Sequence, residues 1–184
     1  MTTQSDIELN IRHLKLPQLI SELSNKDGLV RRHARERVEH SGYEATPRLI
    51  ELLDSPNINA RWEAAKALIH IADPTAGPAL VRALMDESFE IQWLAAEALI
   101  ALGQDAIGPL LEGIIHNYGS IFIRQGAHHV LHDLEQRQLL SPEVHRVLDD
   151  LRCLEPTEPI PLSAVRALET IGNRHKDVPT TSHN

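Results

Sequence analysis

The sequence predicts an all-α fold, a right-handed α-solenoid of about four two-helix repeats closed by C-terminal capping helices. The first reason is a set of prolines, Pro17, Pro47, Pro78 and Pro109, that follow one another at intervals of 30 or 31 residues. A fixed period of 20–50 residues is typical of repeat architectures. The second reason is composition, because the chain is rich in leucine and alanine, both strong helix formers, and only 3% aromatic.

Each proline precedes a short helix with one apolar face. Apolar residues recur two and six positions after the proline, and a spacing of four places both on the same side of a helix. These positions hold Leu19, Leu49, Leu80 and Leu111, and then Leu23, Leu53, Leu84 and Ile115.

A second helix follows in every repeat after a polar turn. Its apolar residues lie 13, 17 and 21 positions after the proline, which again defines one face. They are Val30, Ala60 and Ile91, then Ala34, Ala64 and Ala95, then Val38, Leu68 and Leu99, and in the fourth repeat, shifted by one residue, Ile123, Ala127 and Leu131. The small alanine in the middle allows neighbouring helices to approach closely.

The ends of the chain differ from the repeats. We expect a flexible N-terminus at 1–10, the repeat solenoid at 11–140, capping helices at 141–172 and a disordered tail at 173–184. Ser141 and Pro142 suit the cap and first residue of a helix, and apolar residues at helical spacing follow them.

Composition excludes several classes of protein. The formal net charge of −8 argues against a general polyanion binder, which carries a basic surface. The single cysteine cannot form an intrachain disulfide, and no apolar run reaches the ~18 residues of a membrane span. We therefore expect a cytoplasmic protein without a membrane segment.

Two segments carry a family resemblance. ARWEAAKALIHIADPTAGPALVRALMD and EIQWLAAEALIALGQDAIGPLLEGI resemble HEAT repeats of the phycobilisome-lyase type, over about residues 16–136. The resemblance implies that the second helix of each repeat lines a concave surface. It does not define one function, because this repeat occurs in scaffolds, bilin lyases and other enzymes.

The solvent-facing side of the second helices carries the candidate binding residues. At about 100° per residue, positions 15, 19 and 22 after the proline lie opposite the apolar face. Both tryptophans of the chain fall at the first of these positions in adjacent repeats. Exposed apolar patches mark binding sites, so we expect partner contacts from Trp62, Trp93, Ile69, Ile100, Lys66 and Glu97. Alternatively, the chain's own C-terminal segment covers the patch.

Charged clusters lie at both ends of this surface. Arg31, Arg32 and Arg35 either meet an acidic segment of the partner or form a solvated helix face balanced by nearby glutamates. His128, His129 and His132 are the candidate metal ligands, since the first and last are four residues apart on one helix. Surface histidines without a visible second shell of partners more often simply titrate, so no metal or other cofactor is expected.

We therefore predict a non-catalytic protein–protein interaction scaffold that binds another protein or peptide on the concave surface. Motifs such as HExxH, GxSxG and the P-loop are absent from the sequence, and no catalytic residues are assigned. Two alternatives stay open. One is a bilin lyase-like protein that handles or attaches a chromophore stacked on the tryptophans, and the other is a HEAT-like nucleic-acid-binding module, although acidic residues stand where phosphate partners would be needed. The oligomeric state is not predicted.

Overall fold

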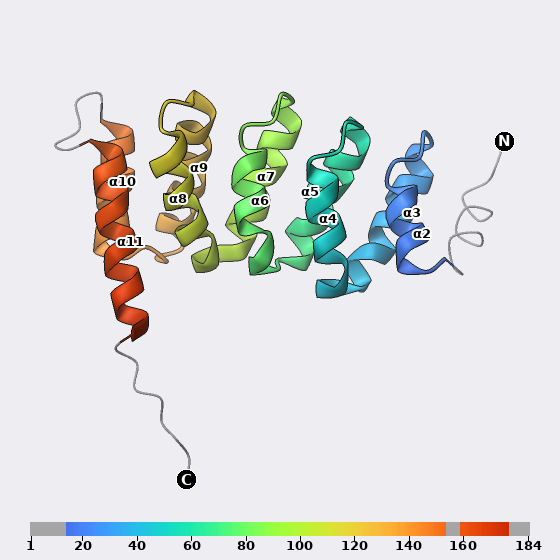
Figure 1. Ribbon diagram of the computed structural model, residues 1–184, viewed down its shortest axis with the longest axis horizontal. Helices are drawn as coiled ribbons and strands as arrows, with labels where there is room; N and C mark the ends of the chain where they lie inside the picture. The colour runs from blue at the N-terminus through green and yellow to red at the C-terminus, as the bar shows by residue number, and fades with distance from the viewer. Residues whose placement is uncertain (1–13, 154–158, 177–184) are drawn as a thin grey trace, which may run out of the picture. The chain divides into compact units, whose positions relative to one another are not determined.

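The computed structural model describes residues 14–153 and 159–176, and within these ranges every regular element is a helix. The chain divides into two compact units, 1–102 and 103–184, called here the N-terminal and C-terminal units. The predicted N-terminal segment 1–10 and most of the predicted tail lie outside the described residues. Figure 1 shows the helices in chain order.

The N-terminal unit consists of helical hairpins, as the proline period predicts. The first pairs α2 (Leu16–Glu22) with α3 (Gly28–His40), the second pairs α4 (Thr46–Leu53) with α5 (Ile58–Ile71), and the third pairs α6 (Gly77–Ala83) with α7 (Phe89–Leu102). The longer helices are neighbours, α3 beside α5 and α5 beside α7, while α4 lies beside α6. The prolines occupy the first turn of the short helices, where their missing N–H costs nothing.

Turn chemistry sets the ends of the helices. The carboxylate of Asp27 and the side-chain oxygen of Asn57 accept hydrogen bonds from the backbone N–H two residues later, and thereby cap α3 and α5. Beyond the long helices the chain turns at equivalent positions with left-handed backbone, at Gly42 (φ 58°), Ala72 (φ 49°) and Gly103 (φ 62°). Alanine is the strained member of this set, because its Cβ disfavours positive φ.

The core follows the predicted columns. The central alanines Ala34, Ala64, Ala95 and Ala127 are fully buried, and the leucines at the two predicted positions of the short helices have at most 4% of their surface exposed. Large side chains in these positions would separate the long helices. The predicted columns are therefore buried in both kinds of helix, except at Val30 and Ile115, which are half-buried.

The C-terminal unit packs differently from a continued repeat. A 3-10 turn (Gly103–Ala106) leads into α8 (Ile107–Asn117), followed by α9 (Ile121–Gln136), α10 (Pro142–Arg152) and α11 (Ile160–Lys176). Here α10 lies beside α9, and α11 lies beside α8 (Figure 1). The last hairpin thus reverses the order of the repeats, since its first helix occupies the long-helix side. α11 extends to Lys176, four residues beyond the predicted end of the capping helices.

Candidate interaction surface

The two tryptophans lie on neighbouring helices with their rings at the surface. Trp93 on α7 is 48% exposed, and Trp62 on α5 is half-buried. The ammonium of Lys66, one turn after Trp62, lies 4.4 Å from the centre of the indole ring, which is a cation–π contact. Part of the shielding of Trp62 therefore comes from a flexible surface side chain.

Two further apolar residues extend this surface and were not predicted from the sequence. Ile58 and Phe89 begin α5 and α7, four residues before each tryptophan, and are 50% and 71% exposed. Ile69 and Ile100 continue the same helices and are half-buried. The sequence does contain a signal for these two residues, because the position 11 residues after the proline is apolar in both repeats. We call Ile58, Trp62, Phe89 and Trp93 the apolar patch.

The remaining predicted residues flank this patch. Glu97 lies on α7 one turn after Trp93 and is half-buried. Arg32 on α3 occupies the position equivalent to the tryptophans, and its Nε donates a 2.9 Å hydrogen bond to Glu36. Because Arg32 donates to the Glu36 carboxylate and lies near it as a positive charge, the pKa of Glu36 is lowered despite partial burial.

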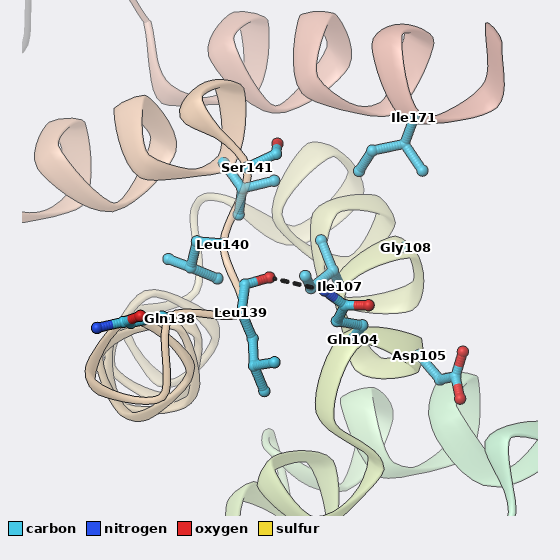
Figure 2. Close-up of a pocket in the computed structure, with 10 residues that line it drawn as sticks. Gln104, Asp105, Ile107, Gly108, Gln138, Leu139, Leu140, Ser141 and Ile171 are labelled. Carbon is cyan, nitrogen blue, oxygen red and sulfur yellow. Dashed lines mark hydrogen bonds between the residues drawn. The ribbon is translucent and has the colours of Figure 1, made fainter. Parts of the chain in front are cut away.

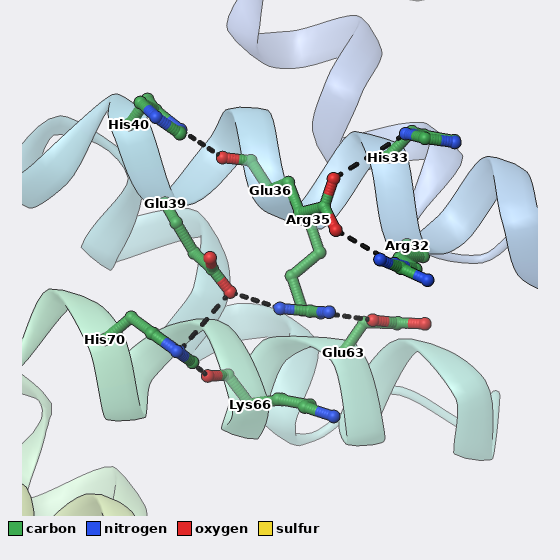
Figure 3. A network of polar contacts seen from close by, with 9 residues as sticks. All are labelled: Arg32, His33, Arg35, Glu36, Glu39, His40, Glu63, Lys66 and His70. Atoms are coloured by element: carbon green, nitrogen blue, oxygen red, sulfur yellow. Dashed lines mark hydrogen bonds and ion pairs between the residues drawn. The ribbon is translucent and has the colours of Figure 1, made fainter. Parts of the chain in front are cut away.

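Arg31 and Arg35 are engaged in contacts inside the unit. Arg35 is only 8% exposed, and its Nε donates a 2.9 Å hydrogen bond to Glu63 on α5, while its Nη1 donates to Glu39 (Figure 3). The Nε of Arg31 lies 3.4 Å from the other carboxylate oxygen of Glu63. Burial raises the pKa of Glu63, although the charges of Arg35 and Arg31 act in the opposite direction. These ion pairs fix α3 against α5.

A second role of Arg31 recurs in every repeat. Its guanidinium donates to the carbonyl oxygen six residues earlier, in the turn between the two helices of the hairpin. Arg61, Gln92 and Arg124, at the equivalent positions, do the same over distances of 2.6–2.9 Å. Turn carbonyls that would otherwise lack a partner are thereby satisfied, so this column is structural.

A pocket of about 510 Å³ opens between α3 and α5. It lies at the edge of the apolar patch, because Trp62 forms part of its wall. Four cationic side chains and two carboxylates line it, and the full set is Gly28, Arg31, Arg32, Arg35, Glu36, Trp62, Glu63 and Lys66. We call this the cationic pocket.

The predicted histidine cluster belongs to a polar junction between α9 and α10. Glu135 accepts hydrogen bonds of 2.6 and 3.2 Å from Arg152, which also donates a 2.8 Å hydrogen bond to Nδ1 of His132. The rings of His128 and His132 stack with centres 6.0 Å apart. The pKa of His128 is lowered mainly by burial, and to a smaller extent by the positive charge of Arg152.

The three candidate metal ligands, His128, His129 and His132, all lie on α9. Among the described residues, no three histidine, cysteine, aspartate or glutamate side chains converge as a ligand set. His129, the third predicted candidate, is half-buried on α9. The side chains around Glu135 instead form an ion-pair network that joins the two helices.

The C-terminal unit also contains a cavity of about 470 Å³ beside the turn between α9 and α10. Figure 2 shows Gln104 donating from its side-chain amide to the carbonyl oxygen of Leu139 across this cavity, at 3.3 Å. Its walls mix aliphatic and polar groups, with no cluster of charged side chains among them.

One stretch of the described chain, Phe89–Asn117, is long and apolar enough to cross a membrane by composition alone. Of its most apolar 18 residues, 56% are buried inside the protein, as in core helices, and Gly103 interrupts the stretch with a left-handed turn. It is therefore weak evidence for a membrane span. The cytoplasmic location stays a prediction.

The hairpins, their buried alanine columns and the surface carried by the long helices define a helical repeat protein of the α-solenoid class. A family model described as HEAT repeats matches residues 16–100 and 46–132. The chain belongs to the HEAT-repeat family, and the predicted fold class and resemblance are confirmed. HEAT repeats as a class support a role as a protein-interaction scaffold, without defining a partner or a surface.

Solved structures agree with this fold. The complex of CpcE and CpcF of phycocyanin lyase from Nostoc sp. PCC7120 matches with a TM-score of 0.55 and 24% identity, over 83% of this chain and 96% of that chain. An engineered protein matches with a TM-score of 0.50 and 22% identity, over 93% of this chain and 86% of that chain. At these identities the similarity is one of fold. No curated protein matches the sequence.

Proposed function

We propose that this protein is a non-catalytic interaction scaffold whose partner docks on the long helices of the N-terminal unit. The observation that carries the proposal is the apolar patch, in which four large side chains gather on two adjacent helices. Burying such a side chain completely is worth about 1.5–3 kcal/mol, so leaving several at the surface favours a bound state.

The roles of the individual residues follow from their positions. Trp62 and Trp93 are the anchors, because tryptophan is enriched among residues that dominate binding energy. Ile69 and Ile100 extend the contact along α5 and α7. Lys66 and Glu97 flank the indoles, where charged side chains contribute register and association rate more than affinity.

The arginines complete the proposed surface at its α3 side. Arg31 and Arg35 hold α3 against α5 and place positive charge beside the patch, while Arg32 projects farther into solvent. An acidic segment of the partner is the complement that this charge favours. The partner is therefore proposed to be a protein or peptide that combines apolar and acidic residues.

Affinity capture from the native host, followed by mass spectrometry, tests the proposal. The wild-type chain is compared with Trp62→Ala plus Trp93→Ala, and with Tyr43→Ala as the matched control. Tyr43 is an aromatic residue in the turn after α3, outside the patch, and is more exposed (61%) than either tryptophan. We expect a specific partner to be retained by the control and lost by the double variant. Equal retention by all three folded proteins would overturn the proposal.

The fold similarity to the CpcE–CpcF complex does not bring a lyase activity to this chain. Paired indoles are nevertheless suited to stacking on a flat tetrapyrrole. Incubation of the folded protein with a bilin separates the two functions, because a shift of the visible band that depends on Trp62 and Trp93 would contradict a purely protein-binding role. A gel-shift assay at low salt tests the nucleic-acid alternative, because binding to DNA or RNA would contradict a purely protein-binding role.

A further inference from the structure

The cationic pocket lies against the apolar patch, since Trp62 belongs to both. We propose that it binds a carboxylate of the docked partner, an aspartate or glutamate side chain that lies beside the residue seated on Trp62. This inference rests on the proposed function and adds the chemistry of the partner to it.

The surface changes character from one long helix to the next. At the first position of the helix, α5 and α7 carry Ile58 and Phe89, whereas α3 carries Gly28. One turn later, where α5 and α7 carry tryptophan, α3 carries Arg32. The missing side chain at Gly28 opens the pocket above the guanidinium of Arg31, which lies within 3.5 Å of where a Cβ at Gly28 would stand.

The charge of the pocket is opposite to that of the whole chain. Four cationic side chains face two carboxylates among the lining residues, which gives a formal charge of +2, whereas the chain carries −8. Glu39, which pairs with Arg35 outside the lining, reduces this to +1. A local positive region on an acidic protein attracts an anionic group and keeps the rest of an acidic partner at a distance.

The cations of the pocket divide into a fixed pair and an adaptable pair. Arg31 and Arg35 are held by Glu63 and by the turn carbonyl of Asn25, so their charge is positioned before the partner arrives. Such preorganisation lowers the cost of binding.

Arg32 and Lys66 form the adaptable pair. The side chain of Arg32 is 61% exposed and paired with Glu36 only at the surface, where exchange of one carboxylate for another costs little. Lys66 lies over the Trp62 ring, so a carboxylate bound to its ammonium lies next to that indole.

Helix spacing converts this arrangement into a sequence pattern for the partner. Packed helices lie about 8–10 Å apart, so the step from Trp62 on α5 to Arg32 on α3 is close to that distance. An extended chain advances about 3.3 Å per residue and a helix about 1.5 Å. Both side chains must also point to the same face, so the acidic residue of the partner stands about two positions from the apolar one in an extended segment, or about seven in a helix.

Selection of a random 12-residue peptide library on the full-length protein tests the inference. Four targets are used: wild type, Arg32→Gln plus Lys66→Gln, Trp62→Ala plus Trp93→Ala, and Arg48→Gln as the matched control. Arg48 is an exposed arginine (64% of its side chain) paired with Glu51 on α4, outside the pocket. Circular dichroism confirms that each variant is folded.

We expect wild type and Arg48→Gln to enrich peptides that combine a bulky apolar residue with an acidic one at the stated spacing. The Arg32→Gln plus Lys66→Gln target should keep the apolar preference and lose the acidic one. A synthetic selected peptide should bind wild type about tenfold more tightly than its Glu→Gln analogue, as loss of a charge-assisted hydrogen bond predicts. That last comparison does not depend on any protein variant.

Three results would overturn the inference: enrichment of apolar peptides without acidic residues, an acidic preference that survives in the Arg32→Gln plus Lys66→Gln target, or no enrichment at all. The proposed function fails separately. Peptides that bind the Trp62→Ala plus Trp93→Ala protein as well as wild type would show that the apolar patch is not the docking surface, whatever their charge.

Discussion

The ion pairs between α3 and α5 allow a quantitative test of how the N-terminal unit is held together. Replacing Glu63 by alanine removes the carboxylate that faces both Arg31 and Arg35. The Glu63 side chain is 4% exposed and that of Arg35 9%, so both charges are largely desolvated. The substitution therefore leaves two guanidinium groups with reduced compensation in a largely buried region.

The expected loss is large for a single polar substitution. Removing one partner of a buried pair costs about 3–5 kcal/mol, because the remaining charge stays desolvated. The matched control is Glu51→Ala, which breaks a 2.8 Å pair with Arg48 whose side chains are both more than 60% exposed. Exposed pairs contribute about 0–1 kcal/mol.

Both proteins are unfolded in urea while tryptophan emission is recorded. Because the only tryptophans of the chain lie on α5 and α7, this signal follows the N-terminal unit. We expect Glu63→Ala to lower the free energy of unfolding by at least 2 kcal/mol more than Glu51→Ala. Equal losses would refute the view that these pairs are buried and hold the helices in register.

Replacing both partners of the Arg35–Glu63 pair tests whether the cost of Glu63→Ala comes from the buried charge that remains. Burial raises the pKa of Glu63, which indicates that desolvation outweighs the attraction of the arginines. Exchanging Arg35 and Glu63 together for methionine should therefore recover part of the stability lost by Glu63→Ala, since apolar residues of similar volume often replace buried pairs without loss. A double variant less stable than the single one would contradict this.

Three further outcomes are expected. Ala72→Gly should stabilise the chain by about 0.5–1 kcal/mol in thermal unfolding, because glycine relieves the left-handed strain that alanine carries there; a lower midpoint would contradict this. Ala95→Leu should cost about 1–3 kcal/mol in urea unfolding, since the alanine is fully buried between long helices, and unchanged stability would argue against close packing. Burial and the Arg152 charge lower the pKa of His128, so the unfolded chain binds its proton more readily. Wild type should therefore lose stability relative to His128→Gln as the pH falls below about 6.5, and parallel pH profiles would exclude this effect.

Much of the fold was predictable because its signal is local. Leucines and alanines at fixed positions after each proline define the buried faces, and they are buried as predicted. The same arithmetic placed Trp62 and Trp93 on the surface of the long helices. It missed Ile58 and Phe89 because these residues begin their helices, before the part of each helix in which the outward-facing columns were counted.

Contacts between distant residues were beyond this reasoning. Arg35 and Glu63 are 28 residues apart, and their pairing depends on which helices are neighbours and on the rotation of each helix. The order of α10 and α11 is a second case. Periodicity predicts that both helices form, but not that α11 returns to lie beside α8.

The most direct measurement is the emission of Trp62 and Trp93 when the captured partner is added. Trp62→Phe and Trp93→Phe isolate one indole each, and acrylamide quenching reports the access of solvent to it. We predict that both signals shift to shorter wavelength and become harder to quench in the complex. A saturated complex in which both indoles keep the emission and the quenching of the free protein would contradict the central claim.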